Sequence, residues 1–219
     1  MTKPKTKAKT TEEYIAEQRA ALAKHPGCGN THYNLGIALV KQQKWDEAIE
    51  ALSAAIEHSP TLAEAYVTLG GIYFHKGDLD ACIGYNERAI RVRPKFAIAF
   101  GNMGFVHLQR GDPEAAVVPL EKAVSINPKF IQGYGSLASA YFMLGRLDES
   151  IAAAKKALEL EPTFAVAHNN LALAYFEKGA FKEAVEHCDQ ALAHGFDVAP
   201  EFLKELEPHR QDEKLKAQS

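Results

Sequence analysis

The stretch that decides the fold runs over residues 29–96. Residues 29–62 read GNTHYNLGIALVKQQKWDEAIEALSAAIEHSPTL, and residues 63–96 read AEAYVTLGGIYFHKGDLDACIGYNERAIRVRPKF. Aligned without a gap, the two segments share a leucine–glycine pair at positions 7 and 8, an alanine at position 27 and a proline at position 32. Self-similarity at a fixed period indicates a repeat architecture, in which each unit buries its apolar face against its neighbours.

The same register continues through three further blocks, 97–130, 131–164 and 165–198. Position 8 is glycine in the first three blocks and alanine in the last two. Position 32 is proline in the first four blocks, and the last block has Phe196 there. Position 27 is alanine in every block, at Ala55, Ala89, Ala123, Ala157 and Ala191. The regular array therefore spans residues 29–198.

Each block contains two segments in which apolar residues have helical spacing, from position 1 to about 14 and from about 17 to 30. Between them, Gly77-Asp78 and Gly111-Asp112 combine a glycine that ends one helix with an aspartate that caps the next. The proline at position 32 stops the second helix because it lacks an N–H and restricts the residue before it. The sequence therefore predicts an all-α fold built from antiparallel helix pairs.

These positions resemble those of the tetratricopeptide repeat (TPR) family, and the resemblance covers residues 29–198. It implies a right-handed superhelical solenoid of helix-turn-helix repeats with a concave binding groove. We expect a disordered basic tail over residues 1–10, a capping helix over 11–28 and five repeats over 29–62, 63–96, 97–130, 131–164 and 165–198. A second capping helix, over 199–207, and a frayed tail complete residues 199–219.

Composition restricts the possible partners. The chain has 219 residues and a net charge of −3, and its three scattered cysteines do not form a disulfide framework. It has no apolar run long enough to span a membrane, and no apolar leader, so we expect a cytoplasmic protein. The tail over residues 1–10 holds four lysines and no acid, so the remainder carries −3 − 4 = −7. That charge argues against a nucleic-acid partner.

On each first helix, positions 2, 5, 6, 9 and 13 lie opposite the apolar stripe. The family resemblance implies that this side, with position 12 at its edge, lines the groove. Every position 6 is a hydrogen-bonding side chain, which partly resembles the asparagine ladder of O-linked N-acetylglucosamine transferases. The predicted groove residues are Tyr33, Asn34, Lys41, Thr68, Phe74, His75, Asn102, Phe105, Gln109, Ser136, Phe142, Asn170 and Phe176.

Two alternatives apply to these groove residues. The position 6 side chains are otherwise ordinary polar groups on solvated helices. The apolar residues at position 12, which include Phe74, Phe142 and Phe176, are otherwise packed between neighbouring first helices. Both interpretations remain open from the sequence.

Motifs for catalysis are absent: the chain has no G-x-S-x-G, H-E-x-x-H, C-x-x-C or phosphate-binding glycine loop. We therefore expect no enzymatic activity and no cofactor. His25, Cys28 and His32 form a candidate metal cluster, but their spacing matches no zinc motif and a fourth ligand is not evident, so we expect no metal site.

The sequence favours a non-enzymatic adaptor that binds a peptide segment or helix of a partner protein in the groove. A self-assembling structural scaffold, in which a terminal repeat docks on another copy, is the alternative. A third and weaker hypothesis is a metal-responsive or redox-responsive repeat protein that senses through His25, Cys28 and His32.

Overall fold

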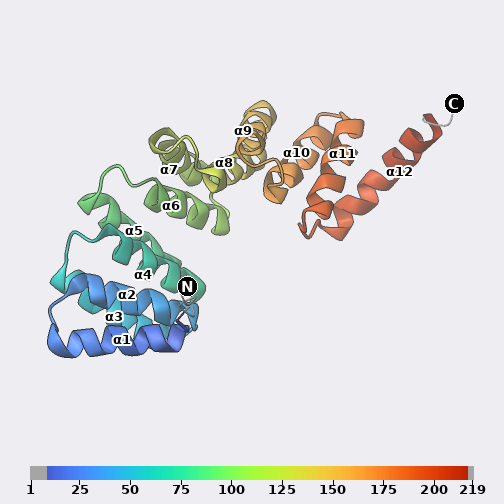
Figure 1. Ribbon diagram of the computed structural model, residues 1–219. Helices are drawn as coiled ribbons and strands as arrows, with labels where there is room; N and C mark the ends of the chain where they lie inside the picture. The colour runs from blue at the N-terminus through green and yellow to red at the C-terminus, as the bar shows by residue number, and fades with distance from the viewer. Residues whose placement is uncertain (1–8, 217–219) are drawn as a thin grey trace, which may run out of the picture. The chain divides into compact units, whose positions relative to one another are not determined.

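The computed structural model describes residues 9–216, with side chains described through residue 210, and every regular element in that range is an α-helix (Figure 1). The helices are α1 (Thr11–Lys24), α2 (Gly29–Lys41), α3 (Trp45–His58), α4 (Ala63–His75), α5 (Leu79–Val92), α6 (Ala97–Gln109), α7 (Pro113–Ile126), α8 (Ile131–Met143), α9 (Leu147–Leu160), α10 (Ala165–Glu177), α11 (Phe181–Ala193) and α12 (Pro200–Lys216). The chain divides into two compact units, through Ala99 and from Phe100 onward, so the boundary lies in the first turn of α6.

The predicted helix pairs are confirmed. Helices α2 and α3, α4 and α5, α8 and α9, and α10 and α11 each pack as a pair within one 34-residue block. Three residues connect the helices inside a block, and four connect one block to the next. The first unit has one core across α1 to α4 and a smaller buried cluster formed by Ala63, Ala89 and Ala99. The second unit has one core across α7 to α10 and another beneath α12.

Small residues lie where the two helices of each pair meet. The alanines at position 27 are all fully buried. A Cβ atom added to Gly36 would lie 2.6 Å from Cγ of Leu52, and one added to Gly104 would lie 2.4 Å from Cγ of Leu120. Because glycine has no side chain at these points, each leucine packs directly against the backbone of the opposite helix.

The turns inside the repeats also follow the sequence. Gly77, Gly111, Gly145 and Gly179 have φ between 69° and 79°, the left-handed conformation that ends a helix. The first repeat lacks this glycine, and Gln43 adopts φ 58° in its place. The side chains of Asp78 and Asp112 accept hydrogen bonds from the backbone N–H groups of Ala81 and Ala115, so both cap the second helix as predicted.

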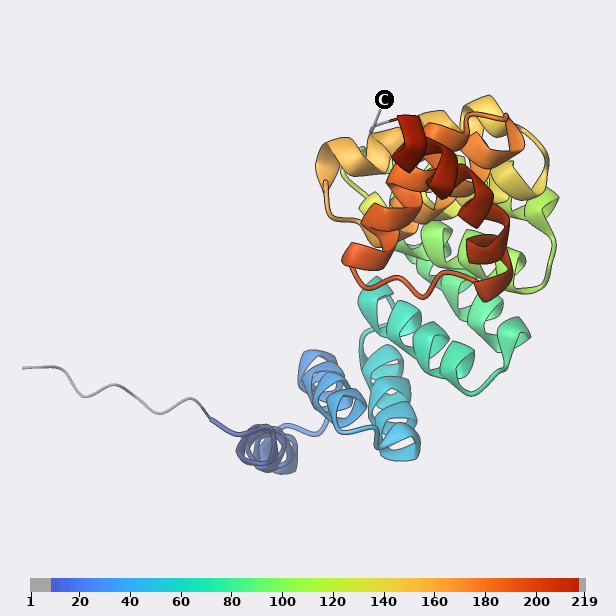
Figure 2. The same ribbon diagram turned by 90° about the vertical axis from the view of Figure 1, so that its right-hand side faces the viewer.

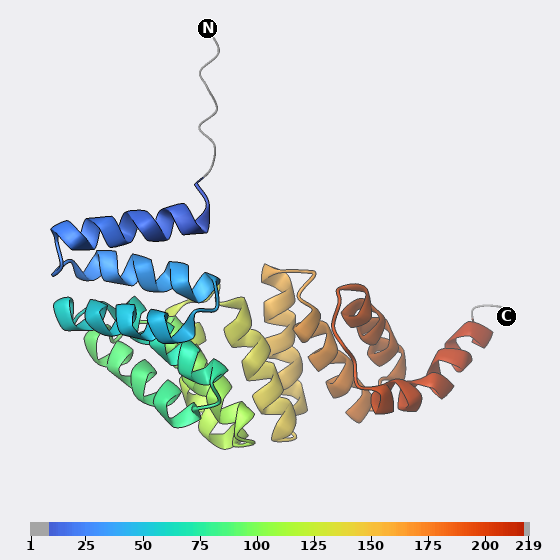
Figure 3. The same cartoon turned by 90° about the horizontal axis from the view of Figure 1, so that it is seen from below.

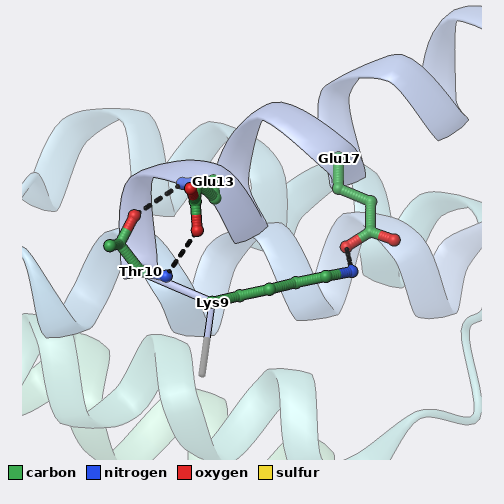
Figure 4. Close-up of polar contacts among 4 residues, drawn as sticks. All are labelled: Lys9, Thr10, Glu13 and Glu17. Atoms are coloured by element: carbon green, nitrogen blue, oxygen red, sulfur yellow. Dashed lines mark hydrogen bonds and ion pairs between the residues drawn. The ribbon is translucent and has the colours of Figure 1, made fainter. Parts of the chain in front are cut away.

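A capping box formed by Thr10 and Glu13 stands at the start of α1, which begins at Thr11, the expected boundary (Figure 4). Thr10 Oγ1 accepts from the Glu13 N–H at 3.2 Å, and Glu13 Oε2 accepts from the Thr10 N–H at 2.9 Å. Lys9 Nζ donates to Glu17 Oε2 at 2.7 Å. Residues 9 and 10 of the expected tail therefore belong to the helix start, and residues 1–8 lie outside the described residues. Figure 3 shows α1 running beside α2, as the predicted capping helix does.

The prediction that the C-terminal helix ends at residue 207 is wrong. After the connection over 194–199, α12 continues through Pro208 to Lys216 (Figure 2). Its continuation is anchored on α11: the His209 ring stacks on Phe181 with centroids 3.6 Å apart, and Arg210 pairs with Asp189 at 2.5 Å. These contacts compensate for the backbone hydrogen bond that Pro208 cannot donate.

The same polar contact recurs between neighbouring repeats. It joins position 14 of one repeat to position 18 of the repeat before it, so the two partners are 30 residues apart in the sequence. The residue pairs are Gln42–Glu12, Lys76–Asp46 and Lys178–Asp148. Gln42 Nε2 donates to Glu12 Oε1 at 2.8 Å, so α1 behaves as the second helix of a preceding repeat. The groups are largely exposed, and each such contact contributes little to stability.

Histidine at position 4 of the first and last repeats contacts the preceding turn. Nε2 of His32 and Nε2 of His168 lie 2.7 Å and 3.0 Å from the carbonyl oxygen of the proline six residues earlier. A second histidine, at position 30, stacks on each ring, His58 on His32 and His194 on His168. These histidines therefore pack where the second helix of a repeat meets the turn before its first helix.

The last repeat adds a third histidine to this arrangement. Nδ1 of His187 lies 3.0 Å from Nδ1 of His168. Because the Pro162 carbonyl can only accept, His168 carries its proton on Nε2, and its Nδ1 accepts from the His187 N–H. Burial, with smaller contributions from His168 and Lys155, lowers the pKa of His187 to about 4, while Glu183 opposes the shift.

Replacing Gly104 with alanine tests the close approach of the two helices. The new Cβ would overlap Leu120, so we expect a loss of about 1–3 kcal/mol in the free energy of unfolding. The matched control is Gly84→Ala, which meets no atom within 4 Å and should stabilise its helix by about 0.5–1 kcal/mol. Urea denaturation followed by circular dichroism gives both values, and equal effects would contradict the close-packing account.

Acidification should weaken the last repeat. In the unfolded chain His187 takes up a proton near its ordinary pKa, whereas in the folded protein its pKa is about 4. The contribution of the neutral ring to the free energy of unfolding is therefore fully present above the ordinary pKa and is lost as the pH falls toward 4. We expect a loss on the order of 1 kcal/mol by about pH 5, after allowance for the half-buried ring. The variant His187→Gln should lose less stability between about pH 7.5 and pH 5 in thermal unfolding; an unchanged pH dependence would contradict the assignment.

Candidate functional site

The second unit contains a hollow of about 560 Å³, which we call the aromatic trough. It crosses α6 and α8 and reaches the start of α10. Its residues are Gly101, Asn102, Phe105, Leu108, Gln109, Phe130, Gln132, Gly133, Ser136, Ser139, Met143, Phe164 and Val166. The structure thus brings together the predicted groove residues Asn102, Phe105, Gln109 and Ser136 in one place.

Glycine at position 5 of the third and fourth repeats shapes this trough. A Cβ atom added to Gly101 would lie 2.3 Å from Cε1 of Phe130, and one added to Gly135 would lie 2.7 Å from Cε1 of Phe164. At these two points, the phenylalanine rings therefore lie directly against helix backbone. The other repeats carry Tyr33, Val67 and Asn169 at position 5.

Sequence reasoning missed Phe130 and Phe164 because they lie at position 34, in the connection between repeats, and not on a first helix. A signal was nevertheless present. Only the third and fourth repeats combine glycine at position 5 with phenylalanine at position 34. Comparison of the five blocks at these two positions would have indicated an altered surface there.

None of the side chains that line the trough is ionisable. Its polar groups are the amides of Asn102, Gln109 and Gln132 and the hydroxyls of Ser136 and Ser139. Such groups can both donate and accept hydrogen bonds, which suits them to the N–H and C=O groups of a peptide backbone.

Apolar side chains remain accessible at this trough. Phe105 is 40% exposed and Met143 is 51% exposed. Exposed apolar surface rimmed by polar groups marks interaction sites on soluble proteins. The trough can therefore bury apolar groups of a ligand while its amides pair with a backbone.

The first unit has a smaller hollow, of about 380 Å³, between the start of α1 and α2. It brings together the predicted groove residues Tyr33, Asn34 and Lys41. Lys9 and Tyr14, which lie just before and within α1, also line this hollow, and the sequence did not predict them as groove residues. Lys41, and Lys9 in its ion pair with Glu17, give this hollow ionisable groups that the lining of the aromatic trough lacks. Glu17 holds the pKa of Lys9 above its ordinary value.

The predicted groove residues of α4 lie outside both hollows. The Thr68 hydroxyl donates to the Glu64 carbonyl oxygen at 2.8 Å within its own helix. The His75 ring packs on Trp45, with centroids 4.5 Å apart. Phe74 is half-buried.

Asn170 differs from the expected ladder residue. It is only 4% exposed, and its Nδ2 donates to the Gly135 carbonyl oxygen and to Ser139 Oγ, both at 3.0 Å. Ser139 Oγ in turn donates to Asn170 Oδ1 at 3.2 Å. The amide therefore joins α10 to α8 instead of facing a ligand. Position 6 of the last repeat lies against Gly135 and Ser139 of the repeat before it.

The position 12 aromatics of the last two repeats occupy packed positions, as the alternative interpretation proposed. Phe142 packs against the core of the second unit. Phe176 makes edge contacts with Phe181 and Phe202, with centroids 5.5 Å and 5.4 Å away. Both are half-buried, and Phe176 lies beneath α12.

The candidate metal cluster has other partners. Thr31 donates its hydroxyl to Cys28 Sγ at 3.1 Å, and His32 is engaged with the Pro26 carbonyl and the His58 ring. Among the described residues, no three or more His, Cys, Asp or Glu side chains come together so that they could hold a metal ion. Within residues 9–216, none of the helices combines the length and apolar character that crossing a membrane requires.

Replacing Asn170 with alanine separates its packing role from a ligand-binding role. The change removes the hydrogen bonds that the buried amide donates to the Gly135 carbonyl oxygen and to Ser139 Oγ, so we expect a loss of about 1–3 kcal/mol in the free energy of unfolding. The control is Asn34→Ala, the same position in the first repeat, where the side chain is exposed. Equal stability of the two variants in urea denaturation would contradict the packing role.

The comparisons with known proteins agree with this geometry. The family signature described as "TPR repeat" matches residues 36–77 and 138–179, and those described as "Tetratricopeptide repeat" match residues 63–96, 97–130 and 165–194. In the search of curated proteins, nothing matched this chain.

Several solved structures share the fold. MamA is 26% identical, with a TM-score of 0.64, over 73% of this chain and 94% of that one. YrrB, described as a TPR protein with an unusual peptide-binding site, is 21% identical, with a TM-score of 0.68, over 90% and 99%. The Cut9–Hcn1 hetero-tetramer of APC/C is 20% identical, with a TM-score of 0.76, over 90% and 39%. The repeating register, the paired helices and the family matches together establish that this chain belongs to the tetratricopeptide repeat family.

Proposed function

We propose that this protein is a non-enzymatic adaptor that binds a segment of a partner protein in the aromatic trough. The observation that carries the proposal is an uncharged, partly apolar hollow that crosses the first helices of consecutive repeats. Small polar groups lie among its apolar side chains, an arrangement that suits an extended backbone with apolar side groups.

The amides and hydroxyls of the trough have defined parts in this proposal. Asn102 and Gln132 would pair with backbone N–H and C=O groups of the bound segment, and Ser136 would add a further hydrogen bond. Tyr33, Asn34 and Lys41 would give the first unit a separate, more polar contact with the partner. Thr68, Phe74 and His75 of α4 remain candidate contacts on the same predicted groove.

Two related structures support a role in protein association. YrrB is described with a peptide-binding site, and Cut9 is described within a hetero-tetramer. Under the same proposal, the protein would help to assemble a protein complex in the cytoplasm. The sequence contains no motif for catalysis, which agrees with an adaptor.

Site-specific photo-cross-linking tests where the partner binds. The photoreactive residue p-benzoylphenylalanine replaces Met143 in the trough or Val118 on α7, since both side chains are apolar and exposed, at 51% and 71%. We expect cross-linked partner protein from a lysate of the native host at Met143 and little at Val118. Denaturing gel electrophoresis and mass spectrometry identify the products.

The control position makes the outcome decisive. Val118 lines a different hollow, on α6 and α7, together with Phe100 and Met103. Equal or stronger cross-linking at Val118 would contradict the trough as the binding surface. A product consisting of two copies of this chain would instead favour the self-assembling scaffold.

A further inference from the structure

We infer that the aromatic trough selects an uncharged peptide segment that places one bulky apolar side chain, aromatic or long aliphatic, against Phe130 and Phe164. This inference rests on the proposed function and specifies the ligand of the same site. It depends on the way in which two glycines position the two rings and on the absence of charge among the residues that line the trough.

The rings provide the apolar contact surface. Phe130 lies over Gly101 and also near Gly133, whose added Cβ would be 2.7 Å from Cδ1 of the ring. Phe164 lies over Gly135 in the same way. Both rings are half-buried and both line the trough, so each keeps a surface that a ligand can cover. Burial of a large apolar side chain against such rings is strongly favourable.

The lining discriminates against charged ligands. A lysine or glutamate side chain that entered the trough would lose water and gain no oppositely charged partner, because the lining holds only amides, hydroxyls and apolar groups. A neutral backbone has no such penalty, since Asn102, Gln132 and Ser136 can satisfy its hydrogen bonds. Selection therefore arises from both apolar attraction and the cost of desolvating charge.

The first unit provides an internal contrast. Its hollow includes Lys9 and Lys41 and lacks a glycine at position 5, where Tyr33 stands. The selectivity inferred for the trough is thus a property of the third and fourth repeats and not of every repeat. Binding of the neutral ligand should accordingly affect α6 and α8 and leave α2 unaffected.

Capped peptides test this selectivity on the full chain. The probes are short acetylated and amidated alanine–serine peptides whose central residue is phenylalanine, leucine, glutamate or lysine. Amide chemical shifts of the ¹⁵N-labelled protein report where each peptide binds and how tightly. We expect shifts at Gly101 and Gly133, and an affinity about tenfold higher for the phenylalanine and leucine peptides than for the charged ones.

Gly101→Ala is the first variant, because its Cβ would displace the Phe130 ring. It should weaken binding of the phenylalanine peptide roughly fivefold, whereas the helix control Gly84→Ala should bind as the unmodified protein does. Met143→Glu is the second variant, and it places a carboxylate on an exposed position of the trough. It should raise the affinity for the lysine peptide relative to the phenylalanine peptide.

Three outcomes would overturn the inference. Charged peptides that bind the trough as tightly as apolar ones would contradict it while leaving the proposed function intact. The same follows if Gly101→Ala binds like Gly84→Ala and Met143→Glu leaves the order of affinities unchanged. Peptides that shift only residues outside α6 and α8 would remove the proposed function and this inference together.

Discussion

The close approach of the two helices within each repeat is the constraint on which the rest of the structure depends. It requires small residues where the helices meet, and the alanine at position 27 is fully buried in all five repeats. Glycine at position 8 lets Leu52 and Leu120 pack directly on the opposite backbone. With this spacing fixed, the helix ends, the turns and the contacts to the next repeat recur in register. The remaining positions are then free to differ between repeats.

The proposed binding surface arises where individual repeats differ from the shared pattern. The position 8 glycines are part of the frame, whereas Gly101 and Gly135 at position 5 are particular to two repeats. Their missing side chains allow Phe130 and Phe164 to lie against helix backbone and to line a shared trough. Function in this protein is therefore best sought where a repeat departs from the pattern.

Much of the fold could be predicted from the sequence because it depends on local chemistry. Periodicity defines the helices, left-handed glycines end them, and Asp78 and Asp112 cap them, each through neighbouring residues. The extension of α12 could not be predicted in this way, since it depends on distant contacts of His209 and Arg210 with α11. The charged character of the sequence after residue 207 indicated a frayed tail, whereas the helix continues through Pro208 to Lys216.

The site was only partly predictable for the same reason. Helical geometry places Asn102, Phe105 and Ser136 on one face across repeats, and all three line the trough. It fails for Asn170, whose partners Gly135 and Ser139 belong to the preceding repeat. An angular position on one helix does not reveal which neighbour will cover it.

The most direct test of the central claim uses the methionine methyl groups, because Met143 lies in the trough while Met103 lies in the hollow on the other side of α6. Protein labelled with ¹³C at the methionine methyl groups is titrated with the capped phenylalanine peptide and followed by NMR. The account predicts that the Met143 resonance shifts and saturates while the Met103 resonance stays in place. A shift of Met103 without a shift of Met143 would contradict it.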